Sequence, residues 1–307
     1  MKKIIQIVVM VLAVITFSAC DKIEGPTREV NNSGVVIGDK IVIDGDTIVF
    51  PDNTSPAISH VLVEDYTGHL CGSCPPAGIQ LNDSMRASFG DQLVVISVHS
   101  GQFADICPAA LDCPSAAPVG AFTMDYRTSV GNAWTTKFGV SANPIGMVDR
   151  TGYPLSHKKT YSSWKTTAQG ELNNAPSAKM DVSLKYDTVT RKLKVGVKTE
   201  MVQAYSGTIK LQMVVVEDSI INWQQWYSHV PTLVPDFVHH NVLRMSMNGD
   251  FGDTLSVSTS TNSGEKLFKG YFNTLASNWN YTKCKVIAFI YDADTYKVIQ
   301  VVEKRIY

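Results

Sequence analysis

This chain of 307 residues has almost no excess charge, because 27 lysine and arginine residues oppose 28 aspartate and glutamate residues. A net charge of −1 gives no electrostatic attraction to nucleic acid, so no nucleic-acid partner is expected. The sequence also lacks internal repeats and low-complexity segments. Beyond its N-terminal leader, no apolar run is long enough to span a bilayer. These absences favour an ordinary globular protein.

Cysteine is scarce, with six residues, and the placement of two of them is informative. Cys71 and Cys74 lie between a strand-like run at 61–66 and a predicted helix near 75–89. Two cysteines so spaced can close a small disulfide ring, and unpaired N–H groups at a helix N-terminus favour a thiolate. The pattern indicates a redox site of the thioredoxin type, with a purely structural disulfide as the alternative.

The N-terminus predicts export. Two lysines precede an apolar run at 4–17, which is too short for a comfortable membrane span and favours a cleaved signal at 1–19. The Ser-Ala-Cys sequence that ends at Cys20 resembles a bacterial lipoprotein box, which implies cleavage before Cys20 and lipidation of its thiol. An ordinary secretory signal is the alternative. The polar composition of segment 20–34 predicts a flexible tether between the lipid and the folded part of the chain.

Export places the remaining cysteines where disulfides persist. Cys107 and Cys113 belong to a predicted insertion at 100–127, where they are expected to form a structural staple; a second redox relay is the alternative. A zinc site at Cys71 and Cys74 would normally need a second pair of ligands, and the spacing of Cys107 and Cys113 is unusual for such a pair. Neither a metal nor a cofactor is therefore expected. Cys284 lies in a strand-like run beside apolar residues and is expected to be a buried free thiol.

The organisation along the chain predicts an α/β unit followed by an all-β unit. Residues 35–56 contain short β-prone runs separated by turn signals, which predict a β-hairpin segment. Residues 57–174 have βαβ character. Residues 175–307 contain short alternating strands that predict an immunoglobulin-like β-sandwich of roughly seven strands. A long piece at 219–241 is expected to interrupt the sandwich as an irregular segment.

The α/β part resembles the thioredoxin fold in the strand before the cysteine pair, the helix and strand after it, and Pro144 before a later strand. The resemblance implies that Pro144 is a cis-proline facing the cysteines and that Asn143 supplies backbone groups for a bound substrate chain. It also implies that Asp65 is a buried acid that takes the proton of the second cysteine, with a raised pKa. Leu70 departs from the tryptophan usual in thioredoxins, which puts partner recognition and redox potential in doubt.

The whole chain resembles a narrower family, the thioredoxin-like outer-membrane lipoproteins of Bacteroidetes called "outer membrane protein 28". The resemblance is carried by residues 63–68, 71–75, 216–218, 240–244 and 286–292. It implies a cell-envelope lipoprotein, facing the periplasm or the surface, with a redox-type domain and a β-sandwich. An adhesin role has been suggested for relatives.

Two functions follow as hypotheses. In the first, a lipid-anchored enzyme exchanges disulfides with exported proteins, Cys71 attacking and Cys74 resolving the mixed disulfide. In the second, a surface adhesin or interaction protein keeps a thioredoxin-like scaffold without turnover. The expected partners are exported proteins with thiols or disulfides, and the bilayer through Cys20.

Three further groups of residues have two interpretations each. His69 is either a cation that stabilises a thiolate or a solvated loop residue. His239 and His240 suggest a metal, but adjacent strand residues point to opposite faces, which favours a structural role. Three aromatic residues form either an exposed patch for contact with a partner or part of the buried core: Trp223, Trp226 and Tyr227.

Overall fold

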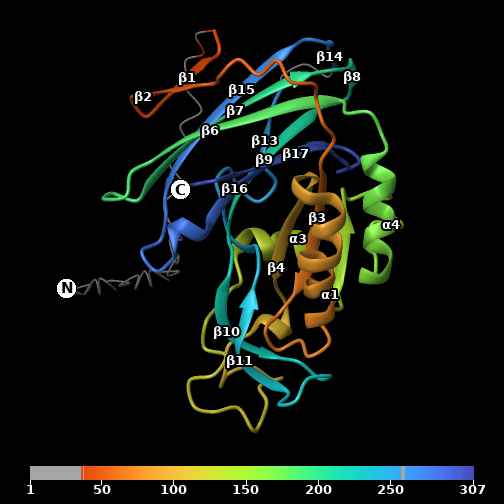
Figure 1. Ribbon diagram of the computed structural model, residues 1–307, viewed down its shortest axis with the longest axis vertical. Helices are drawn as coiled ribbons and strands as arrows, with labels where there is room; N and C mark the ends of the chain where they lie inside the picture. The colour runs from red at the N-terminus through yellow and green to blue at the C-terminus, as the bar shows by residue number, and fades with distance from the viewer. Residues whose placement is uncertain (1–35, 37, 257–259) are drawn as a thin grey trace, which may run out of the picture.

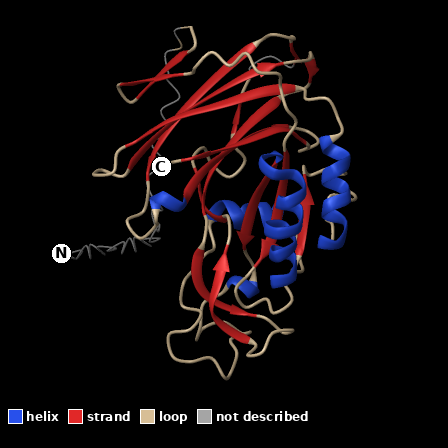
Figure 2. Ribbon diagram, viewed as in Figure 1, coloured by secondary structure: helices blue, strands red, loops and turns tan. Residues whose placement is uncertain are grey.

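The computed structural model describes residues 36, 38–256 and 260–307, so the predicted signal peptide, Cys20 and the tether lie outside the described residues. The fold is mostly β with several sheets, as the sequence predicts in outline (Figure 2). Within the described ranges, the search for a helix long and apolar enough to cross a membrane finds none.

The centre of the fold is one eight-stranded sheet (Figure 1). Its strands, in spatial order, are β17 (Val298–Arg305), β16 (Cys284–Asp292), β9 (Ile209–Glu217), β12 (Val242–Ser246), β4 (Leu93–His99), β3 (Val61–Thr67) and β5 (Ile145–Val148), with β13 (Asp253–Thr254) paired to β9. β12 runs antiparallel to β9 and parallel to β4. The sheet therefore continues through both of the predicted domains, and β12 joins them.

Helices cover both faces of the β4-β3-β5 part. The expected helix near 75–89 forms as α1 (Pro75–Ile79), a π-helical segment η1 (Gln80–Met85) and α2 (Arg86–Phe89), followed by the 3-10 turn η2 (Gly90–Gln92). One apolar cluster packs this segment and α4 (Tyr161–Leu172) onto β3 and β4. Another packs α3 (Ser129–Lys137) onto the opposite face. The β3 and β4 strands are therefore packed on both faces.

A second layer covers the other end of the sheet. β6 (Ala178–Tyr186), β7 (Lys192–Met201) and β15 (Lys266–Thr274) form a three-stranded antiparallel sheet, and a large apolar cluster packs it against β9 and β16. Further short elements are the pair β8 (Tyr205–Ser206) and β14 (Ser260–Thr261), and the 3-10 turns η3 (Gln102–Ala104) and η4 (Tyr281–Lys283). The sandwich thus shares one of its two sheets with the α/β part.

The hairpin of β1 (Lys40–Ile43) and β2 (Asp46–Val49) lies on the outer side of the three-stranded sheet. It falls in the predicted hairpin segment. Gly196 and Gly270 pair across β7 and β15, and a Cβ atom on either would approach side-chain carbons of Ile41 or Ile43 to 3.0 Å or less. The two glycines therefore create the space into which the hairpin packs.

The segment predicted as irregular at 219–241 forms a second hairpin, β10 (Ile220–Gln225) and β11 (Leu233–His239). That prediction was wrong because the segment lacks clear alternation: its buried residue Gln224 is polar, and the pairing shifts register between Asn222 and Gln224. Figure 1 shows this hairpin at the lower end of the molecule, beside the start of α1. It contributes to the site rather than to the sandwich.

A buried ion pair links several elements. The guanidinium of Arg150 donates to both carboxylate oxygens of Glu64 at 2.8 and 2.7 Å, and each side chain is 1% exposed. Four aromatic rings surround the guanidinium at 4.6–5.4 Å: Trp134, Phe138, Phe289 and Tyr291. The pair therefore connects β3 to α3 and to the far strand β16.

We expect Arg150→Met to lower the free energy of unfolding by about 3–5 kcal/mol, because it leaves the Glu64 carboxylate buried without a partner. The exposed Arg305→Met is the control, with an expected change within about 0.5 kcal/mol. Urea unfolding at neutral pH measures both. Equal midpoints for the two variants would show that the pair contributes nothing.

Candidate functional site

The candidate site is built around a disulfide. Cys71 and Cys74 are joined, with their Cα atoms 5.4 Å apart, and each residue is 3% exposed. Cys74 caps α1, and Pro75 and Pro76 occupy the first helical positions, where a missing N–H group costs little. The sequence therefore places the pair at the point where strand gives way to helix.

Residues 68–74, here called the cysteine loop, are enclosed on two sides. A Cβ atom on Gly68 would come within 2.2 Å of the Phe103 carbonyl oxygen. A Cβ atom on Gly72 would come within 2.4 Å of the Tyr227 ring. Both positions need glycine because backbone or an aromatic ring occupies the space of a side chain. The β10–β11 hairpin thus lies directly against the cysteines.

Hydrogen bonds fix this contact. Three hairpin groups donate to carbonyl oxygens of the cysteine loop: Gln225 N to His69 at 2.8 Å, Tyr227 N to Gly72 at 2.8 Å, and Gln224 Nε2 to Cys71 at 3.1 Å. Gln224 is 3% exposed, so its amide compensates for burial by bonding to the loop. The hairpin thus closes the cysteine loop on the side that Tyr227 covers.

Asp65 lies on β3 and is 3% exposed. Its Oδ1 atom has no hydrogen-bond partner, and burial raises the pKa of the carboxyl to about 7. Asp65 and Cys74 line the same cavity, which has a volume of about 260 Å³. A carboxyl that gains and loses its proton near neutral pH is suited to exchange a proton with a thiol.

The cavity lies between the first helical turns and β11, where Gly78 and His239 belong to its walls. His99 also lines it, and β3–β4 pairing sets His99 opposite Thr67 at the strand ends. Burial lowers the pKa of His99 well below its usual value and that of His239 to about 3, so both rings are neutral at physiological pH. The Nδ1 atom of His99 has no hydrogen-bond partner.

His99 was missed by sequence reasoning. The sequence did contain a signal for it: His99 ends the strand that runs parallel to β3, and the carboxyl ends of parallel strands meet at one edge of a sheet. This placement brings His99 close to the residues that follow β3. His69 behaves differently from both sequence interpretations. It is 1% exposed rather than solvated, its Nε2 lies 2.7 Å from the Asp105 carbonyl oxygen, and burial lowers its pKa, which disfavours a thiolate-stabilising cation.

The other predicted residues lie around this site. The Asn143–Pro144 bond is cis, and pairing of Ile145 with Tyr66 places Pro144 beside the end of β3. Its contact with the cysteines stays a prediction. Cys107 and Cys113 are joined by a disulfide in the insertion. The insertion packs on Leu70, the position where thioredoxins usually carry tryptophan.

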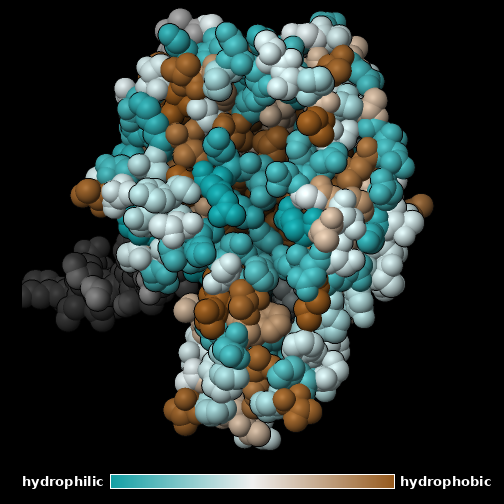
Figure 3. All heavy atoms as spheres, viewed as in Figure 1, coloured by the Kyte–Doolittle hydropathy of each residue, from teal (hydrophilic) through white to brown (hydrophobic). Residues whose placement is uncertain are grey.

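The hairpin aromatics and the remaining candidates separate into buried and exposed groups. Trp223 packs onto the cluster around Leu70, whereas Tyr227 is 62% exposed although its ring covers Gly72. Apolar side chains gather on the lower part of the face in Figure 3, where the hairpin lies.

Cys284 is free and buried, and burial raises its pKa to about 12. Over the described ranges, no group of three or more metal-ligating side chains could hold an ion.

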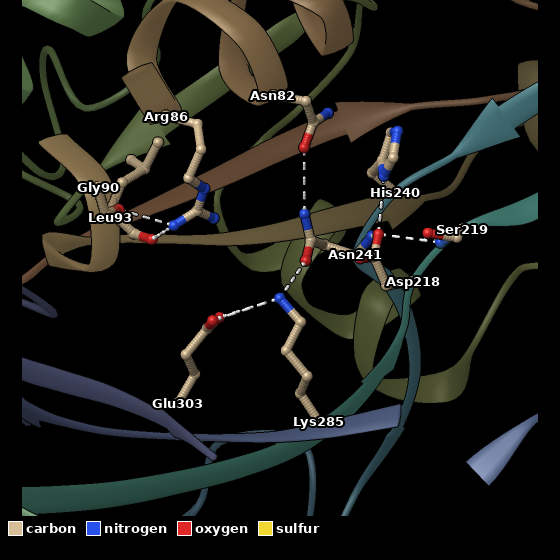
Figure 4. Close-up of polar contacts among 10 residues, drawn as sticks. All are labelled: Asn82, Arg86, Gly90, Leu93, Asp218, Ser219, His240, Asn241, Lys285 and Glu303. Atoms are coloured by element: carbon tan, nitrogen blue, oxygen red, sulfur yellow. Dashed lines mark hydrogen bonds and ion pairs between the residues drawn. The ribbon is translucent and has the colours of Figure 1, made fainter. Parts of the chain in front are cut away.

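A polar cluster holds the base of the hairpin (Figure 4). His240 Nδ1 lies 2.8 Å from Asp218 Oδ1; burial opposes ionisation of Asp218, yet this contact lowers its pKa to about 2. The Asn241 side chain accepts from buried Lys285 at 2.9 Å and donates to Asn82 at 3.4 Å. Lys285 in turn pairs with Glu303 at 3.3 Å. Residues 240 and 241 therefore have structural roles.

Asp65→Asn should remove a pH dependence of stability. The folded protein holds the Asp65 proton up to about pH 7, whereas the unfolded chain releases it near pH 4, so ionisation lowers the free energy of unfolding as the pH rises between these values. The stability of the variant relative to the parent should therefore rise by about 3–4 kcal/mol from pH 4 to pH 7.

Urea unfolding at several pH values, with disulfides intact, measures this difference. Ser97→Ala is the matched control, because it alters another buried polar residue of the same cavity that cannot titrate. It should shift the stability curve without changing its slope. Parallel curves for Asp65→Asn and the parent would refute the raised pKa.

Comparisons with known proteins agree with the sequence resemblance. The family described as outer membrane protein Omp28 matches residues 131–307, which is more than half of the chain. A crystal structure of a protein from Agrobacterium tumefaciens is similar over 82% of this chain and 97% of that one, with 12% identity and a TM-score of 0.46. A domain of the outer membrane lipoprotein Omp28 from Porphyromonas gingivalis is similar over 43% of this chain and 90% of that domain, with 20% identity and a TM-score of 0.29. No curated protein matches the chain.

Proposed function

This chain belongs to the outer membrane protein Omp28 family, which makes it a cell-envelope protein, and we propose that it exchanges disulfides through Cys71 and Cys74, which precede the matched residues 131–307. The family match confirms the resemblance noted in the sequence and gives the outer-membrane location. Lipid anchoring through Cys20 and exchange with exported proteins are the further parts of this proposal.

We infer that residues 57–174 form a thioredoxin-like unit and that 175–307 form an immunoglobulin-like sandwich. Support for the first comes from β3 and β4 running parallel around the helical segment after the cysteines, and from β5 running antiparallel to β3. The unit departs from the thioredoxin pattern after β5. There the next strand is reduced to one bridge between Gly146 and Lys159.

The observation that carries the exchange reaction is the shared cavity of Asp65 and Cys74. In the reduced protein, the Cys71 thiolate attacks a partner disulfide, one partner sulfur leaves as a thiol, and a mixed disulfide forms. Asp65 then takes the proton of Cys74, whose thiolate attacks Cys71 and releases the second partner thiol. The products are a reduced partner and the Cys71–Cys74 disulfide. The reverse sequence oxidises a partner, and Asn143 and Pro144 are proposed to bind its chain.

A second candidate is an interaction protein that keeps this scaffold without turnover. The observation that favours it is the closed cysteine loop, since Tyr227 covers Gly72 and both cysteines are 3% exposed. In that case the disulfide stabilises the loop and has no redox partner.

The two candidates predict different redox behaviour. Equilibration of the folded protein with mixtures of reduced and oxidised dithiothreitol, followed by alkylation and mass analysis, should show a Cys71–Cys74 pair that reduces and reoxidises reversibly. The control is a protein with Cys107 and Cys113 both replaced by serine, which should titrate in the same way. Reduction of the pair only after circular dichroism reports unfolding would favour the scaffold.

Asp65→Asn should slow the resolving step by about a hundredfold without preventing the first attack, because the amide cannot accept a proton from Cys74. The rate at which the mixed disulfide disappears, followed by mass analysis, measures that step. Asp187→Asn, in an exposed connection after β6, is the control and should resolve at the parent rate. An equal rate for Asp65→Asn would remove Asp65 from the mechanism.

A further inference from the structure

The two cysteines differ in what surrounds them. Of the pair, Cys74 is the one that lines the cavity between the first helical turns and β11. The Cys71 carbonyl oxygen accepts from Gln224, and Tyr227 covers the adjacent Gly72. A polypeptide strand that approached Cys71 from this side would have to displace the hairpin. The cavity, by contrast, reaches Cys74 while the hairpin stays in place.

Asp65 and His99 line the cavity, and each has a buried polar atom without a protein partner, Oδ1 and Nδ1 respectively. Both residues are 3% exposed, so the lining has polar groups that are desolvated without full compensation by the protein. With about 260 Å³, the cavity falls below the roughly 300–1,000 Å³ typical of sites for drug-sized ligands. Its occupant is therefore small.

The charges of the cavity select among small molecules. Asp65 and Asp83 line it, and the lining contains neither lysine nor arginine. Its buried histidines are neutral at physiological pH, as described above. The half-exposed His240 also lines the cavity, but its ring is already paired with Asp218 at 2.8 Å. Above pH 7, where Asp65 is ionised, the two carboxylates have no unpaired protein cation beside them in the lining, so they attract an ammonium group and repel a carboxylate of the ligand. The complementary ligand thus combines an amine with the thiol that reacts with Cys74.

We propose that this cavity is the binding site of a small amine-bearing thiol that exchanges with the disulfide at Cys74. This assignment rests on the proposed exchange function and adds a second substrate class to it: the small thiol reduces the disulfide at Cys74, and the Cys71 thiolate so formed then reacts with a protein partner. The bound thiol gives its proton to Asp65 and attacks Cys74 Sγ; the disulfide breaks, and Cys71 leaves as a thiolate. A second thiol attacks the ligand sulfur of the mixed disulfide, and Cys74 leaves. Two small thiols become one small disulfide, and the protein pair gains two electrons and two protons.

Reduction kinetics with three probe thiols test the charge selection: cationic cysteamine, neutral 2-mercaptoethanol and anionic thioglycolate. The rate of each with the folded protein is divided by its rate with the protein unfolded in urea, which removes differences in intrinsic reactivity. The normalised rate for cysteamine should exceed that for thioglycolate by about tenfold or more. Equal normalised rates for the three probes would overturn the assignment while leaving the exchange function intact.

A blocked cavity tests the location. Gly78 lines the cavity, and a Cβ atom there meets nothing within 4 Å, so Gly78→Trp can fold and fill the opening. Gly170→Trp is the matched control, because Gly170 is also a helical glycine with open space around it. Gly78→Trp should lower the cysteamine rate about tenfold, Gly78→Leu less, and Gly170→Trp not at all. An unchanged rate in Gly78→Trp, with a native circular dichroism spectrum, contradicts the proposal.

Single-cysteine variants identify the reacting sulfur. In Cys71→Ser, the Cys74 thiol should form an adduct with cystamine, the disulfide of cysteamine, faster than the Cys71 thiol of Cys74→Ser does. A slower reaction of cystamine with Cys74 than with Cys71 would overturn the small-thiol assignment, whether or not Cys74→Ser captures polypeptides on Cys71. If no thiol reduces the folded protein at all, the exchange function fails together with this inference.

Discussion

The structure depends on one joint, the pairing of β12 with β4. The Ser97 N–H group donates to the Asn241 carbonyl oxygen at 2.9 Å, and Val242 is the residue of β12 that pairs with β4. Asn241 has a φ of 51°, a left-handed conformation that asparagine tolerates better than most residues. Its side chain bonds to Lys285 and Asn82, so one residue ties the sandwich strands to the helical segment.

The joint also positions the β10–β11 hairpin. β11 ends at His239, two residues before Asn241, and the Asp218–His240 contact brings the two ends of the hairpin together. From this base the hairpin extends to the cysteine loop that follows β3. The hydrogen bonds from Gln225 and Tyr227 to the cysteine loop thus fix the far end of a hairpin whose base is held at the β12–β4 joint.

The difference between local features and contacts made far along the chain explains what the sequence could and could not predict. The cysteine pair, Asp65 and the strands around them are local features, so spacing and alternation locate them. The β12–β4 pairing joins residues more than a hundred positions apart, and no local pattern encodes it. The hairpin was missed because Gln224, a polar residue, is buried through bonds to backbone carbonyl groups that only the folded chain brings near. His99 was missed for a different reason: its place at the end of the strand parallel to β3 was predictable, but the unpartnered ring nitrogen is evident only in the folded chain.

Asp65 gives the strongest argument that the site does more than stabilise a loop. At neutral pH and above, a carboxyl whose pKa is raised to about 7 lowers stability by an amount on the order of 4 kcal/mol. A purely structural core would place an apolar residue at this position of β3 and avoid the loss, because most of its strand neighbours are apolar and buried. Residues that destabilise the fold to this extent, such as a buried carboxyl without a partner, are found mainly at functional sites. The unpartnered oxygen of Asp65, in a residue that shares a cavity with Cys74, is therefore the feature on which the proposed exchange function rests.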